Sequence, residues 1–192
     1  MSANDSIVAA ATPIGESAIA VIRVSGTLCQ ELCKDALRVP YPTPRRSILA
    51  GYRDIEECLI DDVIFVFYEE QNSYTGEPSL EISSHGNPLI TKKIIEDLVA
   101  RGCRLAEPGE YTKRAFLSGR MDLTQAESVA TLIKASSERA LEVARIQLRG
   151  DLGKKISDLQ SRLLDLQANL EAYIDFPEED LPSEDIKGRS EE

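Results

Sequence analysis

The sequence predicts an α+β protein, in which a domain of short strands mixed with helices is followed by an all-α segment. Its 192 residues are enough for one or two domains. Short, partly β-branched apolar stretches fill residues 7 to about 110, and from Glu110 onward the apolar residues recur with a helical period. This change of period predicts a boundary near residue 118, with an N-terminal domain over 1–118 and the first part of a helical domain over 119–192.

The N-terminal stretch predicts two strands that pair with each other, and then a helix. Apolar residues 7–11 and 18–24 flank Thr12-Pro13-Ile14-Gly15, whose proline and glycine are turn signals. Ser25-Gly26 opens an amphipathic stretch that reaches Leu37, as expected of a helix. Proline cannot continue a helix because it lacks the backbone N–H, so the proline-rich residues 40–44 are expected to be a connector.

Three further strands and a second helix are expected before residue 110. The strands cover 47–52, 59–68 and 79–83, the last because its apolar residues alternate with polar ones. Asn87-Pro88 is typical of a helix start, since the amide side chain caps free backbone N–H groups and proline fits the first turn. We expect this helix to end at Gly102 and to lie on the sheet through one apolar stripe, formed by Leu89, Ile90, Ile94, Ile95, Leu98 and Val99.

The segment after residue 118 is predicted to be helical. Thr124 with Glu127 predicts a capping box, and residues 135–138 predict a break with a fresh cap before a much longer helix. Apolar residues recur three and four apart along that helix, at Ile156, Leu159, Leu163, Leu166, Leu170 and Tyr173. Such a stripe needs a helical partner, from a missing segment or a second chain, so we do not expect a solitary monomer. The helix is predicted to end at 175–177, before a linker or solvated acidic tail.

The net charge of −11 is unevenly distributed. Of the 33 acidic and 22 basic residues, eight and two lie in residues 175–192, which leaves 25 acidic against 20 basic residues elsewhere. With no large basic patch, this chain alone is not expected to capture nucleic acid tightly by charge. No apolar run approaches the ~20 residues of a membrane span and no basic, apolar signal sequence opens the chain, so a cytoplasmic location is expected.

The cysteines and the single histidine predict no metal site. Cys29, Cys33, Cys58 and Cys103 are too few and scattered for a disulfide framework, and with one histidine in the chain we interpret them as reduced thiols. His85 would have to carry any histidine-based acid or base chemistry, but a polar residue before a capped helix often only orients the turn, and no catalytic residue is assigned.

No phosphate-binding loop occurs in the sequence. Residues 150–155 (GDLGKK) have the wrong spacing, lack the final hydroxyl and lie within a helical pattern. Nucleotide hydrolysis by a P-loop mechanism is therefore excluded for these residues.

Three charged residues stand in unusual settings. Arg23 lies in an otherwise apolar strand, Glu81 between Leu80 and Ile82, and Arg120 after Gly119 at the predicted domain junction. One interpretation is that they occupy the solvated face of the strands. The other is that they converge, because a carboxylate accepts paired hydrogen bonds from an amino-pyrimidinone edge and guanidinium groups clamp carboxylates, which together describe a site for a folate.

Several strings, taken together, resemble the MnmE (TrmE) family of tRNA modification GTPases. They follow the family in order and spacing over about residues 5 to 180, and they are residues 5–15 (DSIVAAATPIG), 22–26 (IRVSG), 74–77 (YTGE), 84–86 (SHG), 107–117 (EPGEYTKRAFL), 121–127 (MDLTQAE) and 173–179 (YIDFPEE). The resemblance implies a mixed sheet with packed helices, similar to the folate-binding domain of aminomethyltransferases, followed by the start of a helical domain.

The resemblance also implies a ligand and partners. It assigns folate contacts to Arg23, Glu81 and Arg120, with 5-formyltetrahydrofolate or a related tetrahydrofolate as the one-carbon donor. It implies a homodimer formed through the N-terminal domain, which acts with the flavoprotein MnmG on the wobble uridine of tRNA. GTP and potassium belong to the family's inserted GTP-binding domain, which is absent from this sequence, so we expect a fragment, a truncated chain or the product of a split gene.

Two other interpretations remain open. One is a ligand-free structural module that mediates assembly. The other is a free-standing folate-dependent one-carbon transferase. The transferase would need a catalytic acid within this chain, for which His85 and the carboxylates are the candidates.

Overall fold

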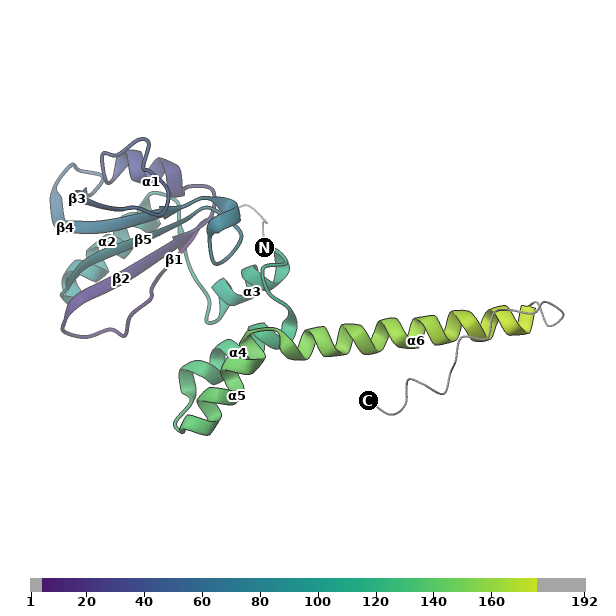
Figure 1. Ribbon diagram of the computed structural model, residues 1–192. Coiled ribbons are helices and arrows are strands. Elements are labelled where there is room, and N and C mark those ends of the chain that lie inside the picture. The colour runs from purple at the N-terminus through teal and green to yellow at the C-terminus, as the bar shows by residue number, and fades with distance from the viewer. Residues whose placement is uncertain (1–4, 176–192) are drawn as a thin grey trace.

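A computed structural model describes residues 5–175 of the chain. Its first part contains a six-stranded mixed sheet in the order β3-β4-β5-β2-β1-β6 (Figure 1). All neighbouring strands run antiparallel except β1 and β6, which are parallel. The strands are β1 Ile7–Ala10, β2 Ser17–Ser25, β3 Ser47–Arg53, β4 Leu59–Tyr68, β5 Ser79–Gly86 and β6 Arg104–Leu105. The predicted α+β class is confirmed.

The predicted strand pair at the N-terminus is confirmed, whereas one strand was missed. β1 and β2 pair antiparallel, with Val8 opposite Val24 and Ala9 opposite Arg23. The missed strand is β6, whose two residues pair parallel with β1, Ile7 lying opposite Arg104. Two residues are too few to show a period of two, so only the tertiary pairing reveals this strand.

Helices α1 Cys29–Asp35 and α2 Pro88–Ala100 contribute buried residues to one core cluster with the sheet. α1 is shorter than the predicted amphipathic stretch, and a 3₁₀ helix, η1 Glu70–Asn72, was not predicted. The side chain of Asn87 caps α2 by accepting a hydrogen bond from Leu89 N at 2.8 Å, as predicted. Ile94 and Leu98 are fully buried, so the helix does lie on the sheet, although Leu89 and Val99 at the stripe's margins are exposed.

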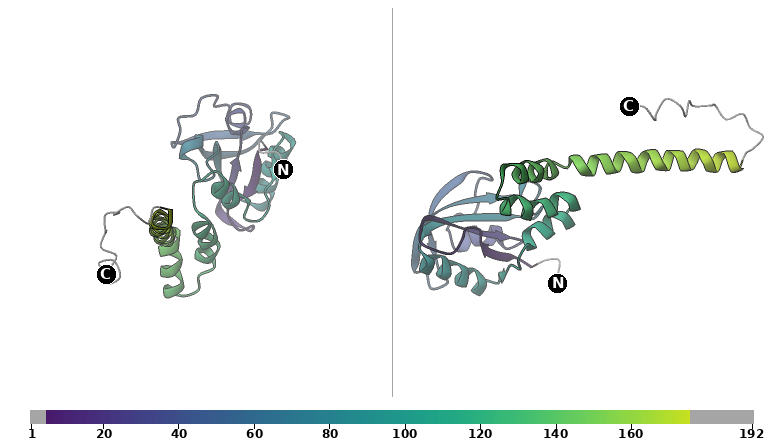
Figure 2. Two further views of the ribbon diagram at one scale, coloured as in Figure 1. Left: turned by 90° about the vertical axis from the view of Figure 1, so that its right-hand side faces the viewer. Right: turned by 90° about the horizontal axis from the view of Figure 1, so that it is seen from below.

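Four helices follow the sheet along the chain: α3 Glu110–Leu117, α4 Leu123–Lys134, α5 Glu138–Leu148 and α6 Asp151–Asp175. α4 and α5 lie side by side, and α6 projects away from the rest of the molecule (Figures 1 and 2). The apolar stripe of α6 is uncovered within the described chain: Leu159, Leu163 and Leu166 are each more than 60% exposed. The predicted helix end at 175–177 and the acidic tail fall largely outside the described residues.

The prediction of a capping box at Thr124 and Glu127 is wrong. The N-cap of α4 is Asp122, whose side chain accepts from Gln125 N at 2.8 Å, while the Gln125 side chain accepts from Asp122 N at 2.9 Å. Thr124 instead donates its hydroxyl to Asp122 at 2.7 Å. Two pairs with the same spacing of three compete here, and the pair in which the first residue has extended backbone angles forms the cap.

The prediction of one long helix after residue 138 is also wrong, although its start is correct. Ser137 caps α5 by accepting from Ala140 N at 3.2 Å. The helix ends at Leu148, because Gly150 adopts the left-handed conformation with φ of +81° and separates α5 from α6. The helical pattern predicted through residues 150–155 is therefore interrupted at its first residue.

Candidate functional site

The structure brings two of the three predicted site residues, Arg23 and Glu81, into contact. β2 and β5 are neighbours, and their register places Arg23 directly opposite Glu81. Arg23 donates from Nε at 3.0 Å and from Nη2 at 2.5 Å to the same oxygen, Glu81 Oε1. Both side chains are about 30% exposed, so the pair is accessible from solvent. Glu81 Oε2 therefore remains available to accept hydrogen bonds from other donors.

Three tyrosines surround this ion pair. Tyr68 OH donates to Glu81 Oε2 at a long 3.4 Å, and the rings of Tyr74 and Tyr111 lie 5.7 and 5.8 Å from the Arg23 guanidinium carbon. Tyr111 OH also donates to the backbone oxygen of Arg23 at 2.6 Å. Burial and the nearby Glu81 charge raise the pKa of Tyr68, and burial raises that of Tyr111, so both hydroxyls stay protonated donors at neutral pH.

The ion pair and two of the three tyrosines line a cleft of about 190 Å³, formed by Arg23, Tyr68, Asn72, Tyr74, Thr75, Ser79 and Glu81. The volume is below the roughly 300–1,000 Å³ of complete small-molecule sites, so the cleft suits one ring system of a larger ligand. Its lining combines a carboxylate acceptor, guanidinium donors, aromatic rings and hydroxyls. That combination can hold a flat, polar heterocycle by its edge. A second cleft of about 210 Å³, between α1 and the end of α2, contains none of the predicted site residues.

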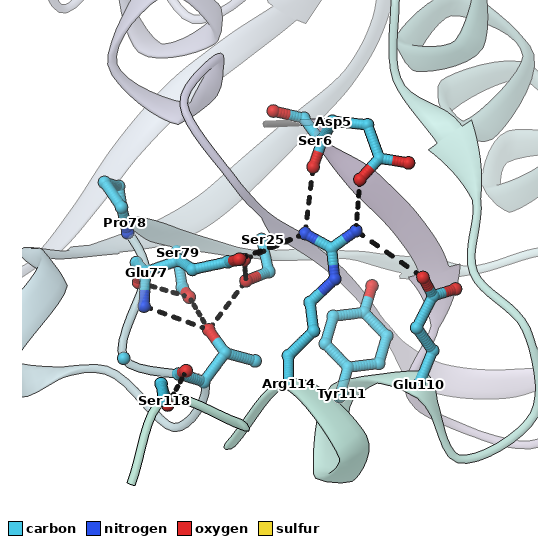
Figure 3. Close-up of polar contacts among 12 residues, drawn as sticks. Asp5, Ser6, Ser25, Glu77, Pro78, Ser79, Glu110, Tyr111, Arg114 and Ser118 are labelled. Carbon is cyan, nitrogen blue, oxygen red and sulfur yellow. Dashed lines mark hydrogen bonds and ion pairs between the residues drawn. The ribbon is translucent and has the colours of Figure 1, made fainter. Parts of the chain in front are cut away.

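One wall of the cleft belongs to a hydroxyl and carboxylate network around residues 73–78 (Figure 3). Ser25 Oγ lies 2.6 Å from Thr75 Oγ1 and donates to Glu77 Oε2 at 2.9 Å. Thr75 Oγ1 lies a further 3.4 Å from Ser79 Oγ. Ser118, at the end of α3, donates to the Thr75 backbone oxygen at 2.6 Å.

An ionic cluster beside this network joins four separate parts of the chain. Arg114 on α3 contacts Asp5, Glu77 and Glu110, and Arg104 on β6 contacts Asp5 and Glu110. The Arg104 guanidinium holds the pKa of Glu110 at about 2 although burial opposes this, and the Glu107 backbone N–H assists. The pKa of Asp5 is likewise lowered, chiefly by Arg104 and Arg114. This cluster was not predicted from the sequence.

Comparison with known proteins finds one family along the whole chain. The family described as "GTP-binding protein TrmE N-terminus" matches residues 6–120, and the "MnmE helical domain" matches residues 123–192. The chain belongs to the MnmE (TrmE) family. A tRNA modification GTPase MnmE of Opitutus terrae is 51% identical over 94% of this chain, and that of Aquifex aeolicus is 47% identical over 94%. Both alignments cover 40% of the relative, so the chain spans about two fifths of the length of these MnmE proteins.

Arg120, the third residue predicted from the MnmE resemblance, does not line the cleft. It is exposed after α3, and its backbone N–H donates to Ala115 O at 2.9 Å. Its Cγ would lie 3.2 Å from a Cβ added to Gly76, so its side chain passes close to the 73–78 loop. A direct contact between Arg120 and a ligand stays a prediction.

His85 lies apart from the cleft lining. Its Nδ1 is 2.8 Å from Asp61 Oδ1, and its backbone N–H donates to Asp61 Oδ2 at 2.8 Å. The imidazole is 70% exposed, so Asp61 orients it toward solvent rather than toward the Arg23–Glu81 pair. Within residues 5–175 the His, Cys, Asp and Glu side chains form no group that could hold a metal ion. In the same range no helix is both long and apolar enough to cross a membrane.

Proposed function

We propose that this chain forms the N-terminal and helical parts of a tRNA-modifying GTPase, and that its cleft binds a tetrahydrofolate one-carbon donor such as 5-formyltetrahydrofolate. The observation that carries the proposal is the Arg23–Glu81 pair at the edge of a tyrosine-lined cleft. The full activity is modification of the tRNA wobble uridine together with MnmG. GTP hydrolysis and its potassium ion belong to a GTP-binding domain that these residues do not include.

The residues of the cleft have distinct roles in this proposal. Glu81 accepts hydrogen bonds from the amino and ring N–H groups of the pterin through Oε2, the oxygen that Arg23 leaves free. Arg23 orients the Glu81 carboxylate and offers its remaining N–H groups to a carbonyl or anionic part of the ligand. Tyr68 and Tyr74 supply aromatic surface, and Arg120 is the second cation. The bound folate supplies the one-carbon unit.

Calorimetric titration with 5-formyltetrahydrofolate tests the proposal. Replacing Glu81 by Ala removes a charge-assisted acceptor, which costs about 1.5 to 3 kcal/mol, or roughly tenfold or more in affinity. Glu81→Gln keeps the shape but offers the pterin an amide, and should weaken binding similarly. Glu96→Gln on the exposed side of α2 is a matched control without access to the cleft. Equal affinities for the wild type and Glu81→Ala would end the proposal.

Homodimerisation through the N-terminal domain is part of the same proposal. α1 and α2 contribute to the core on one side of the sheet, while the alternating residues on the other side include exposed Leu49, Ile64 and Ile19. Leu49 and Ile64 are direct cross-strand neighbours on β3 and β4. Exposed apolar patches of this kind mark interaction surfaces. Sedimentation of Leu49→Glu and Ile64→Glu variants tests this part, and an unchanged dimer would refute it.

A second candidate function, a structural assembly module without a ligand, is favoured by the uncovered stripe of α6. Such a module would associate without folate and give no heat on folate titration. Leu163→Glu, within the stripe, should then reduce association measured by analytical ultracentrifugation. Leu164→Glu is the matched control, since Leu164 has nearly the same exposure but lies outside the series of three and four. Equal effects of the two substitutions would count against the stripe.

A further inference from the structure

The loop of residues 73–78, here called the cleft loop, has little structure of its own. Within it, Gly76 N donates to Ser73 Oγ at 3.0 Å, and Ser73 Oγ donates back to Glu70 O at 3.2 Å. Yet Tyr74 and Thr75 of this loop form one wall of the cleft. The position of that wall must therefore be set largely by contacts with other elements.

Arg114 makes the only ion pair to the cleft loop within residues 5–175. Its Nη1 lies 3.0 and 3.2 Å from the two carboxylate oxygens of Glu77, and also donates to the Asp5 backbone oxygen at 2.9 Å. Its Nη2 donates to Asp5 Oδ1 at 2.6 Å. The side chain is only 12% exposed, so water screens these contacts weakly (Figure 3).

Glu77 passes this constraint on to the cleft. Its Oε2 accepts from Ser25 Oγ, which in turn lies 2.6 Å from Thr75 Oγ1 in the cleft lining. Neither Arg114 nor Glu77 lines the cleft, so neither contacts the part of a ligand that the cleft holds between Arg23 and Glu81.

We propose that Arg114 is a positioning residue for the cleft: through Glu77 it holds the cleft loop, and with it Tyr74 and Thr75, beside the Arg23–Glu81 pair. This inference rests on the proposed folate site, but it assigns a role to residues outside the cleft lining. It also explains why a buried guanidinium bridges α3, the start of β1 and the cleft loop.

Arg104 provides a matched control within the same cluster. It donates to Asp5 at 2.8 Å and to Glu110 at 2.6 and 3.1 Å, two of the three carboxylates that Arg114 contacts, but it does not contact Glu77. Arg104→Met and Arg114→Met therefore both leave Asp5 and Glu110 with fewer partners. Only Arg114→Met releases the cleft loop. Glu77→Gln weakens the hold on the loop without removing either arginine, because it removes the charge that pairs with Arg114, and it serves if Arg114→Met folds poorly.

Two measurements on the whole chain test the inference. In titrations with 5-formyltetrahydrofolate, Arg114→Met and Glu77→Gln should each bind about tenfold more weakly than the wild type, and the double variant should bind no more weakly than either alone. Arg104→Met should stay within roughly twofold of the wild type even if its melting temperature falls. In amide hydrogen exchange without ligand, residues 73–79 should exchange faster in Arg114→Met and Glu77→Gln, but not in Arg104→Met.

The outcomes separate this inference from the folate proposal. If Arg104→Met weakens binding as much as Arg114→Met does, Arg114 acts through stability alone and the inference is overturned. Unchanged exchange of the cleft loop in both Arg114→Met and Glu77→Gln overturns it too. If the wild type does not bind the folate, the folate proposal fails, while the exchange data still decide whether Arg114 holds the loop.

Discussion

Glu110 should make the protein strongly dependent on pH in the acid range. Its Oε1 accepts from Arg104 at 2.6 Å, and its Oε2 accepts from Arg104 at 3.1 Å and from the Glu107 backbone N–H at 2.7 Å. Its side chain is 7% exposed. These contacts hold its pKa at about 2, against an ordinary value of 4.5.

The size of the effect follows from this shift. At 1.36 kcal/mol per tenfold change in acidity, lowering the pKa from 4.5 to about 2 stabilises the folded protein by about 3 kcal/mol. Since Arg104 is 38% exposed, solvent screening reduces this stabilisation to roughly 2 kcal/mol. Because the folded pKa lies below the unfolded one, this stabilisation is complete above the unfolded pKa near 4.5. It is lost as the pH falls from there through about 2.

Glu110→Gln isolates this charge, because the amide can still accept the hydrogen bond from Glu107 N. The free energy of unfolding should fall by about 2 kcal/mol at pH 7, and the difference between variant and wild type should shrink as the pH approaches 2. Urea denaturation followed by circular dichroism at pH 7, 5, 4 and 3 measures both. Glu107→Gln is the control, since the Glu107 side chain is exposed. A difference that stays constant across this pH range would refute the reasoning.

Three further predictions concern stability and reactivity. Gly76→Ala should cost about 1 to 3 kcal/mol more in thermal unfolding than Gly109→Ala, because both have positive φ but only at Gly76 would the methyl lie 2.6 Å from a side-chain oxygen; equal costs would contradict this. Asp122→Ala should cost about 1 kcal/mol of stability and Thr124→Ala less than about 0.5 kcal/mol. A larger cost for Thr124→Ala than for Asp122→Ala would instead support the cap at Thr124 that the sequence predicts. A thiol reagent at pH 8 should label the exposed Cys58 of the folded protein and reach the other cysteines only on unfolding, because they are buried and burial raises their pKa. Rapid labelling of several thiols in the folded protein would count against this core.

The sequence predicts most of the strands and singles out Arg23 and Glu81, but it does not predict that these two residues pair. Leu80 and Ile82 are buried while Glu81 between them is not, as alternation predicts. The same rule places Arg23, which lies between buried Ile22 and Val24, on the side of its strand that faces away from the core. That the two face each other depends on the register of β2 against β5, strands separated by more than 50 residues, which no local pattern encodes.

The ionic cluster and the tyrosines were missed for a related reason. Asp5, Glu77, Arg104, Glu110 and Arg114 come from four separate segments, and each taken alone is an ordinary charged residue. Their signal lay in three of the strings that resemble the family, residues 5–15, 74–77 and 107–117. These strings supply four of the five cluster residues and two of the three tyrosines. The local error at the α4 cap arose where two residue pairs fit the same spacing. The error at Gly150 arose because the surrounding helical pattern hides a glycine that adopts the left-handed conformation and ends α5.

The cleft and the α6 stripe are physically independent, so the result of a test on one does not determine the result of a test on the other. The cleft is built on strands whose apolar side faces a continuous core with α1 and α2, and this core includes fully buried Phe65, Ile82 and Leu98. None of its members comes from α4, α5 or α6. Burial of this extent stabilises the sheet whether or not α6 is covered. Gly150 further separates α6 from α5, so a Leu163→Glu variant that no longer associates should still bind folate with unchanged affinity, and joint loss of both properties would show that the site needs the assembled protein.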